Sequence, residues 1–375
     1  MDKIELKLDA TSCAEFIIEK DTTYSWLSKF RVKSSNRIFV VVDDFIDDKM
    51  GGQLLKQLNK QGKEIFWMPF QSLEENKGLE NFIDLVKIFE HKGLSRFDLV
   101  LGIGSGVLLD IVSFTASVYM RGVPLILVPT TLIGQVDAAT AGKTCVNSEK
   151  GKNLVGTLYL PQFVYNNIRF LDTLSEYHWR QGFSEIFKYG LLGSPYLLSL
   201  LEKFSTSKSD EVLLEIIKET IKVRIDLRIK DPLSSNLGHT FGHAMEKLSD
   251  YQIGHGDAIA SGTLMAIKFS ELQGISREGL FDEILDKMER LKLNRYYSAN
   301  LDPEDIVSLM LKDKKSSFDK INLVLISDIG IPFSKDSNPF YSVDSDSIHN
   351  FLKYYFSKYS NLSAIDLDKT LLKGI

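Results

Sequence analysis

Three of the six histidines in this chain, His239, His243 and His255, stand within 17 positions of one another. On a helix, His239 and His243 would be four residues apart and would point to the same face. Neutral imidazoles on one face, joined by a third from a nearby loop, are ligands that a divalent metal such as zinc prefers. A single histidine is usually an ordinary core or surface residue, but this local density predicts metal binding or catalysis.

A carboxylate would complete such a metal site, and the chain contains many carboxylates. Two of them stand out because of their surroundings. They are Asp137, in the segment Val136-Asp137-Ala138, and Glu185, in the segment Ser184-Glu185-Ile186. The residue pattern does not choose between them, so the identity of the carboxylate stays open at this point.

A glycine-rich turn, Gly102-Ile103-Gly104-Ser105-Gly106, follows an apolar run and precedes a helical pattern that begins near Val107. Glycines there would let the backbone approach a pyrophosphate, and the helix N-terminus would offer free amide donors. The third glycine of the usual dinucleotide fingerprint is missing, so the turn alone fits nucleotide binding and a plain tight connection equally well. Thr130-Thr131, after the next apolar run, would add hydroxyl groups at the same edge of a sheet.

Several lysines stand among small residues in the middle of the chain, in Gly142-Lys143-Thr144 and Gly151-Lys152-Asn153. Exposed lysines usually belong to the solvated surface. Small neighbours, however, allow a ligand to approach closely, and the lysine ammonium is a good point charge for phosphate. The pattern therefore predicts a phosphate-bearing substrate beside the metal.

The elements that would position these residues follow an α/β order in the first part of the chain. Apolar runs at 38–42, 99–103 and 125–128 are typical of buried parallel strands, and 79–90 has helical periodicity between them. We therefore predict a Rossmann-like parallel-sheet domain, of the type that binds nucleotides, over residues 1–165.

Residues 166–375 are predicted to form a mainly α-helical domain that binds metal and substrate. Helical periodicity is clear at 196–204 and 211–228, and residues 321–326 form one further strand candidate.

Bulk composition limits the partners and the compartment. The net charge of −5 argues against nucleic acid or an anionic membrane as the main partner. The two cysteines, Cys13 and Cys145, make a disulfide framework improbable and suit a reducing compartment. No apolar run approaches the roughly 20 residues of a membrane span, and the first residues lack a signal-peptide pattern. We therefore expect a cytoplasmic enzyme with no membrane partner.

Together, these motifs resemble the 3-dehydroquinate synthase family of sugar-phosphate cyclases. The resemblance extends from about residue 35 to about residue 330, with the motifs in the family's order and nearly at its spacing. It rests on Glu74-Glu75-Asn76-Lys77, Tyr119-Met120-Arg121-Gly122, Pro129-Thr130-Thr131-Leu132, Val136-Asp137, Gly142-Lys143-Thr144, Val146-Asn147, Gly151-Lys152-Asn153, Ser184-Glu185-Ile186-Phe187-Lys188-Tyr189-Gly190, Gly238-His239-Thr240-Phe241-Gly242-His243-Ala244 and His255-Gly256-Asp257.

The resemblance implies a role for each matching residue. The metal ligands would be Glu185, His239 and His255. The resemblance thus selects Glu185, and not Asp137, as the carboxylate ligand. NAD would contact Asp44, Glu74, Lys77, Gly104, Ser105, Gly106, Val107, Asp110, Thr130, Thr131, Lys143, Lys152, Phe170 and Thr173. Substrate and catalytic contacts would come from Asp137, Lys143, Lys152, Asn153, Lys188, Asn236, His243 and Arg121. In this family the arginine at the last position reaches the phosphate from the neighbouring subunit of a homodimer.

The resemblance also implies a reaction that needs NAD and a divalent metal, zinc or cobalt. NAD oxidises a secondary alcohol, phosphate is eliminated, the hydride returns, and an intramolecular aldol step closes the ring. The simplest form of this reaction converts 3-deoxy-arabino-heptulosonate 7-phosphate to 3-dehydroquinate.

Two departures from the family's pattern bear on cofactor and substrate. Leu109 stands where the family has a glycine before Asp110, which predicts a different helix start and not the loss of the cofactor. The connection at 231–236 is several residues shorter than in the family and lacks the arginine that grips the substrate carboxylate. The helix lysine of the family aligns with either Lys218 or Arg224, depending on where the gap is placed.

Three alternatives follow from this comparison. A related cyclase could act on a sugar phosphate without a carboxylate, such as sedoheptulose 7-phosphate. A metal-dependent NAD polyol or glycerol-phosphate dehydrogenase would produce net NADH, whereas a cyclase would release phosphate without it. A non-catalytic relative would have no reason to keep all three metal ligands. The set of Lys143, Lys152-Asn153 and Lys188 favours a cyclase.

Overall fold

The structure, a computed structural model of the chain, describes residues 2–7, 13–23, 25–28, 35–140, 142–149, 151–231, 233–293, 301–312, 320–336 and 338–359. The chain packs into two compact units. The first unit comprises Met1–Trp179 and Ser209–Ile225, and the second comprises Arg180–Lys208 and Asp226–Ile375.

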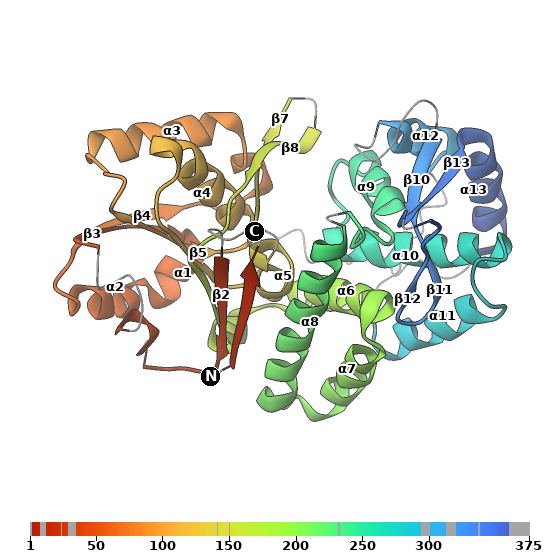
Figure 1. Cartoon of the computed structure of the whole chain (residues 1–375), viewed down its shortest axis with the longest axis horizontal. Helices are drawn as coiled ribbons and strands as arrows, with labels where there is room; N and C mark the ends of the chain where they lie inside the picture. Colours follow the sequence, from red (N-terminus) through yellow and green to blue (C-terminus); the bar gives the residue numbers. More distant parts are fainter. Residues whose placement is uncertain are drawn as a thin grey trace. The chain divides into compact units, whose positions relative to one another are not determined.

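A seven-stranded sheet forms the centre of the first unit (Figure 1). Its strands, in spatial order, are β1 (Asp2–Lys7), β2 (Cys13–Glu19), β9 (Phe163–Asn167), β6 (Leu125–Pro129), β5 (Leu99–Gly104), β3 (Arg37–Asp43) and β4 (Glu64–Phe70). β1 pairs antiparallel with β2, and all the other neighbours are parallel. Helices cover both faces of the central strands, which explains why these strands read as unbroken apolar runs.

The helices of the first unit alternate with the parallel strands, as an α/β fold requires. They are α1 (Asp44–Ile46), α2 (Gly52–Asn59), α3 (Leu79–His91), α4 (Gly106–Val118) and α5 (Leu132–Val136). Shorter helical turns are η1 (Ser25–Ser28), η3 (Asp47–Gly51), η4 (Glu74–Asn76), η5 (Tyr119–Arg121), η6 (Ala138–Thr140) and η7 (Ile168–Thr173). Figure 1 shows α3 and α4 on one face of the sheet and α2 on the other.

The predicted parallel α/β arrangement is confirmed. The runs at 38–42, 99–103 and 125–128 lie in β3, β5 and β6, and the pattern at 79–90 lies in α3. β5 and β6 are neighbours, and the Thr130 amide donates a hydrogen bond of 3.0 Å to the Gly104 carbonyl. The glycine turn and the threonine pair therefore lie at the same edge of the sheet, as expected from their positions after two strands.

A separate hairpin carries the lysine-rich segment. β7 (Lys143–Ser148) and β8 (Gly151–Leu158) pair antiparallel outside the main sheet. Sequence patterns indicated small residues and cations here but no hairpin. The two strands approach closely at Gly156, where a Cβ atom would lie 2.0 Å from the Thr144 carbonyl oxygen, so glycine is required.

The second unit is mainly helical, which confirms the predicted character of this part of the chain. The helices that lie wholly or partly in it are α6 (Glu176–Gly193), α7 (Pro195–Ser207), α8 (Asp210–Lys230), α9 (His239–Leu248), α10 (His255–Leu272), α11 (Leu280–Arg290), α12 (Pro303–Leu311) and α13 (Ser345–Tyr359). The first residues of α6 and most of α8 belong to the first unit.

Two small antiparallel pairs complete the second unit. β10 (Lys320–Val324) pairs with β13 (Phe340–Asp344), and β11 (Ile326–Asp328) pairs with β12 (Ile331–Pro332). The strand candidate at 321–326 thus lies in β10 and at the start of β11. The assignment of NAD binding to residues 1–165, and of metal and substrate binding to residues 166–375, stays a prediction.

Across the described ranges, no helix combines the length and the apolar character that crossing a membrane would need.

Close packing of α9 on α10 depends on glycines at their crossing. Gly238 precedes α9 with a left-handed φ of 76°, and a Cβ there would lie 2.5 Å from the Thr263 amide nitrogen. A Cβ on Gly262 would lie 2.2 Å from the Gly238 carbonyl oxygen. The two helices therefore meet backbone to backbone, which fixes the start of α9 against the middle of α10.

We expect the substitution Gly262→Ala to lower the free energy of unfolding by roughly 1–3 kcal/mol, because the added methyl group must push α9 and α10 apart. Urea unfolding of the two proteins measures this difference. Gly52→Ala is the control: no atom lies within 4 Å of the new Cβ and φ is −61°, so stability should be unchanged or slightly raised. An unchanged midpoint for Gly262→Ala would contradict the close packing.

Candidate functional site

Side chains of Glu185, His239 and His255 converge within the second unit. One ligand atom of each lies within 4.8 Å of the others. Glu185 Oε1 is 3.8 Å from His239 Nε2 and 3.2 Å from His255 Nε2. Glu185 is fully buried and His239 is almost so. Two imidazole nitrogens and a carboxylate oxygen thus face a common point, which is a donor set suited to a divalent cation.

Each of the three donors stands at a defined place in a helix. Glu185 is in the middle of α6, and His239 and His255 are the first residues of α9 and α10. His239 and His243 share α9, as their spacing predicts, with ring centroids 5.1 Å apart. His255 was expected on a loop. It instead begins a helix, directly after the extended backbone of Gly254.

The other nitrogen of each histidine donor is held away from Glu185. His239 Nδ1 lies 3.1 Å from the Leu237 carbonyl oxygen, and His255 Nδ1 lies 3.1 Å from Glu246 Oε2. These contacts orient both rings so that Nε2 faces the carboxylate, an arrangement common among histidines that bind metals. The role of Glu246 was not foreseen from sequence, although its position three residues after His243 on a helix is a usable signal.

The two histidines have opposite protonation tendencies in the absence of a metal. Burial, assisted by the nearby charge of Lys188, holds the pKa of His239 well below its usual range. Burial also acts to lower the pKa of His255, but the Glu246 and Glu185 carboxylates outweigh it and raise this pKa to about 10. His239 therefore favours the neutral form, whereas His255 favours the protonated form, which the carboxylates of Glu246 and Glu185 stabilise.

Lys188 lies one helical turn after Glu185 and is only 1 % exposed. Its ammonium forms an ion pair with Glu185 Oε2, and lies 4.1 Å from the centroid of the Tyr189 ring. The two oxygens of Glu185 are thus divided: one faces the lysine and the other faces the histidines. This division fixes the orientation of the carboxylate.

A polar link between α6 and α10 fixes Glu185 relative to His255. Gln181 Oε1 accepts hydrogen bonds from the amides of Gly256, at 2.5 Å, and Asp257, at 3.3 Å. Gln181 Nε2 donates to Asp257 at 2.8 Å, and Arg180 Nε donates to the same carboxylate at 3.0 Å. These residues were not predicted, because nothing local in the sequence marks a contact between positions so far apart.

Two further predicted residues of the second unit, Asn236 and His243, lie close in sequence to the metal donors. The Asn236 carbonyl accepts from the His239 amide at 3.1 Å. Asn236 Nδ2 is buried and has no hydrogen-bond partner among the residues that the structure describes. His243 is exposed at the surface of α9 and forms a second group of possible ligands with Glu246 and His255.

The predicted nucleotide turn connects β5 to α4 in the first unit. α4 begins at Gly106, and Ser105 precedes it in an extended conformation. The hydroxyl oxygens of Ser72 and Ser105 are buried without hydrogen-bond partners in the described ranges. A Cβ on Gly104 would lie 3.0 Å from Leu108 and 3.1 Å from Asp43, so close packing of the turn favours glycine. Thr131 caps α5 by accepting from the Gly134 amide at 3.1 Å.

A buried ion pair joins two other residues predicted to contact the cofactor, Lys77 and Asp110. Burial raises the pKa of Asp110, although Lys77 acts in the opposite direction. Cys145 Sγ lies 3.4 Å from the same carboxylate, and burial is the main cause that raises the pKa of this thiol to about 12. The thiol therefore stays protonated near neutral pH.

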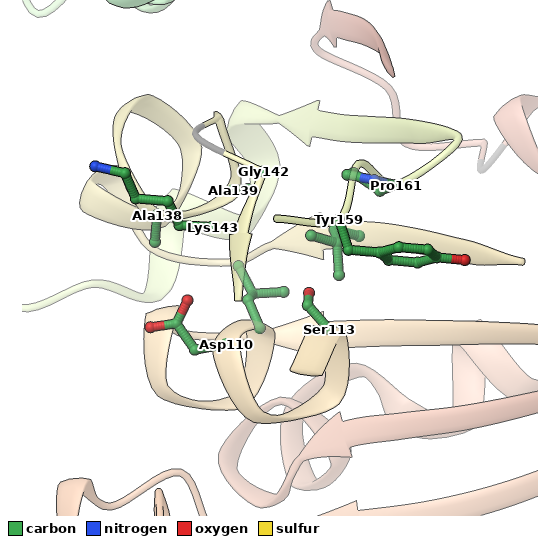
Figure 2. A pocket seen from close by; sticks show the side chains of 10 residues that line it. Asp110, Ser113, Ala138, Ala139, Gly142, Lys143, Tyr159 and Pro161 are labelled. Carbon is green, nitrogen blue, oxygen red and sulfur yellow. The ribbon is translucent and has the colours of Figure 1, made fainter. Parts of the chain in front are cut away.

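Asp110 and Lys143 also line a small pocket within the first unit. Its walls are Leu109, Asp110, Ser113, Leu127, Ala138, Ala139, Gly142, Lys143, Tyr159 and Pro161. Figure 2 shows Asp110 and Lys143 on one side and Tyr159 on the other. The pocket joins the helix that follows the glycine turn to the start of the β7–β8 hairpin, two regions that sequence reasoning treated separately.

Asp137 lies beside Arg224, whose Nη1 is 2.8 Å from Asp137 Oδ1. Arg224 is buried in the first unit. Lys218, the other residue that could align with the family's helix lysine, instead pairs with Asp2 and Glu215. The alignment of the family's helix lysine with Arg224 therefore places a cation next to Asp137, a predicted substrate residue, whereas the alignment with Lys218 does not.

The remaining predicted residues of the first unit have varied surroundings. Asp44 is exposed at the start of α1, and Arg121 is exposed in η5 with a left-handed φ of 63°. Phe170 packs in the hydrophobic core, while the Thr173 hydroxyl donates to the Phe170 carbonyl at 3.3 Å. Glu74 and Lys152, in different segments, lie together at 3.5 Å.

We expect Gln181→Leu to lower the free energy of unfolding by roughly 1–3 kcal/mol, because the Gly256 amide would be buried without its acceptor. Chemical denaturation monitored by circular dichroism measures the change. The control Gln252→Leu alters an exposed side chain of the same unit and should change stability by no more than about 0.5 kcal/mol. Equal stabilities for the two variants would contradict the structural role of Gln181.

Comparison with known proteins places these features in a family. Two family models match consecutive parts of the chain: 3-dehydroquinate synthase N-terminal over 67–181 and 3-dehydroquinate synthase C-terminal over 182–316. The chain is 31% identical to the 3-dehydroquinate synthase of Clostridium acetobutylicum, over 94% of this chain and 99% of that protein. It is 40% identical to the 3-dehydroquinate synthase of Thermococcus kodakarensis, over 68% of this chain and 74% of that protein.

Solved structures share the fold. A 2-deoxy-scyllo-inosose synthase complexed with carbaglucose-6-phosphate, NAD+ and Co2+ superposes with a TM-score of 0.82 at 22% identity, covering 94% of this chain and 100% of that one. A 2-epi-5-epi-valiolone synthase from Streptomyces hygroscopicus with NAD+ and Zn2+ gives 0.81 at 23% identity, covering 94% and 99%. An iron-containing alcohol dehydrogenase is less similar, with a TM-score of 0.64 at 15% identity, covering 92% and 97%.

Proposed function

This chain belongs to the 3-dehydroquinate synthase family, and from that premise we propose that it closes a carbon ring on a phosphorylated sugar acid or sugar. The simplest reaction is the conversion of 3-deoxy-arabino-heptulosonate 7-phosphate to 3-dehydroquinate, because relatives above 30% identity carry that enzyme's name. The observation that carries the proposal is the convergence of Glu185, His239 and His255 on one point.

We propose that these three residues bind a divalent metal, zinc or cobalt. Two histidines and a glutamate are a known ligand set of catalytic zinc, which keeps a fourth position for water or substrate. The donors fit this use, since both Nε2 atoms face Glu185 while both Nδ1 atoms have other contacts. Structures of the same fold contain Co2+ or Zn2+.

We propose that the first unit binds NAD at the edge of its sheet. The support is chemical: the hydroxyls of Ser72 and Ser105, which have no hydrogen-bond partner among the described residues, the close-packed glycine turn and the amides at the start of α4 suit a pyrophosphate. The proposed contacts are Asp44, Glu74, Lys77, Gly104, Ser105, Gly106, Val107, Asp110, Thr130, Thr131, Lys143, Lys152, Phe170 and Thr173. The core position of Phe170 restricts its contribution to the backbone.

Bound NAD supplies reversible hydride transfer, and a bound metal supplies positive charge beside the reacting oxygen. The residues of the chain would orient the substrate. Asn236 Nδ2, which is buried, is suited to donate a hydrogen bond to a substrate hydroxyl. Lys143 and Lys152 would neutralise phosphate, with Arg121 of a homodimer partner adding charge. His243, being exposed, can exchange a proton with a substrate oxygen.

The remaining proposed substrate contacts are Asp137, Asn153 and Lys188. Lys188 is buried beside Glu185, so it would present a fixed positive charge and not a mobile one.

A substrate without a carboxylate is the second candidate. Its support is the short connection at 231–236, in which no arginine occurs and Pro232 lies outside the described residues. One candidate replacement, Arg224, is already paired with Asp137. A carboxylate would have to compete for that guanidinium, whereas a ketose phosphate without a carboxylate, such as sedoheptulose 7-phosphate, has no such group to place.

We expect purified protein with NAD and zinc or cobalt to release phosphate from one of these two sugar phosphates without accumulating NADH. A phosphate assay and absorbance at the NADH band, followed in the same reaction, measure both products. His239→Ala should abolish phosphate release, because it removes one of three metal donors. Stoichiometric NADH without phosphate release would instead identify a dehydrogenase and contradict the proposal.

We expect Glu246→Gln to weaken zinc binding about 10–100-fold, because the His255 ring would lose the carboxylate that orients it. Competition with a chromophoric chelator measures the affinity without relying on turnover. Glu271→Gln is the matched control, since that carboxylate also lies in the second unit but pairs with Lys268. Equal zinc affinities for Glu246→Gln and wild type would count against the orienting role.

A further inference from the structure

The side chain of Asn147, near the end of β7, forms hydrogen bonds in two directions. Its Nδ2 donates to Glu74 Oε1 in η4 at 2.8 Å. Its Oδ1 accepts from the Asn153 amide in β8 at 3.0 Å. The Asn147 backbone amide also donates to the Lys77 carbonyl at 2.7 Å. One residue therefore connects the η4 loop to the far strand of the β7–β8 hairpin, all within the first unit.

The residues that Asn147 holds are those with proposed functions. Glu74 and Lys77 are proposed to contact NAD, and Lys152 and Asn153 to contact the substrate or the cofactor. Lys152 Nζ lies 3.5 Å from Glu74 Oε1, the same oxygen that accepts from Asn147. The position of this carboxylate thus helps to determine where the lysine ammonium lies.

Asn153 needs such support because its backbone is unusual. Its φ is 57°, in the left-handed region that residues other than glycine rarely adopt. The hydrogen bond to Asn147 holds its amide, and Cys145 Sγ donates to its side-chain oxygen at 3.1 Å. Asparagine tolerates this conformation better than most residues. The contacts of the Asn153 backbone amide and side-chain oxygen stabilise the left-handed conformation further.

We propose that Asn147 is a positioning residue that sets the geometry of Glu74, Lys152 and Asn153 for NAD binding and turnover. The inference rests on the proposed function of the first unit, and it adds a residue that makes no contact with the reacting atoms itself. The role requires a side chain that donates on one side and accepts on the other at fixed length. Among the standard residues of this size, only asparagine provides both.

Two substitutions separate these requirements. Asn147→Ala removes both hydrogen bonds. Asn147→Asp keeps the shape and the acceptor for the Asn153 amide but replaces the donor with a negative charge facing Glu74. We expect Asn147→Ala to weaken NAD binding about tenfold, as for the loss of about one net hydrogen bond to a charged group. Asn147→Asp should weaken it at least as much, because it repels Glu74.

Thr157→Val is the matched control. Thr157 bonds to Thr144 and Ser117 within the hairpin and its supporting helix, and it has no role in the proposed site. This variant should lose stability while NAD affinity stays within about twofold of wild type. If Asn147 only stabilised the hairpin, Asn147→Ala and Thr157→Val would have similar NAD affinities, and the proposal would be wrong.

The experiment measures NAD dissociation constants by calorimetry for wild type, the three variants, Glu74→Gln and the double variant Asn147→Ala with Glu74→Gln. If Asn147 acts by positioning Glu74, the double variant should bind NAD only slightly more weakly than Asn147→Ala alone. Full additivity of the two effects, or unchanged NAD affinity in Asn147→Ala, would overturn the inference while leaving the proposed function intact.

Amide hydrogen exchange gives a readout that does not depend on NAD. Exchange at residues 151–155 should be faster in Asn147→Ala than in Thr157→Val, because the Asn153 amide loses its acceptor. Equal exchange in the two variants would also overturn the inference. A wild-type protein that fails to bind NAD would refute the proposed function, and this inference with it.

Discussion

A single buried carboxylate determines much of the second unit. Glu185 is fully excluded from solvent, where an uncompensated negative charge would cost several kcal/mol. Its compensation comes from Lys188 on one oxygen and from His255, whose pKa is raised, on the other, which the neutral His239 ring also faces. These partners stand on α6, α9 and α10, so the three helices must keep a fixed register. The glycine contacts of α9 with α10 and the Gln181 contacts of α6 with α10 serve that register.

The part of this arrangement that is local in sequence could be predicted. Apolar runs of strand length identified β3, β5 and β6, and the four-residue spacing of His239 and His243 placed both on one helix. Both predictions depend on patterns only a few residues long: an unbroken apolar run for a strand buried on both faces, and a four-residue spacing for one face of a helix. The choice of Glu185 over Asp137 as the third donor was different. It came from family resemblance alone, and the structure places Asp137 beside Arg224 in the other unit.

The contacts that could not be predicted join segments that are distant in the chain. Glu246 orients His255 through a contact that forms only when α9 packs on α10, and Gln181 accepts from the amide of Gly256, 75 residues later in the chain. Asn147 is similar, since its partner Glu74 is 73 positions away. The hairpin was missed for another reason: alternation in β8 is weak because four consecutive residues of that strand are exposed, so it lacks the pattern of a half-buried strand.

His239 and His255 each begin a helix, and this position affects the charge of the ligand that could bind beside them. The amino end of a helix carries a partial positive charge of about half a unit, so two such ends add to the electrostatic potential around Glu185. Lys188 already balances the carboxylate. A dication held there would keep most of its charge and would repel a positively charged ammonium group. An oxygen that becomes negative during the reaction would be attracted to the dication, so the scaffold itself discriminates between ligands by charge.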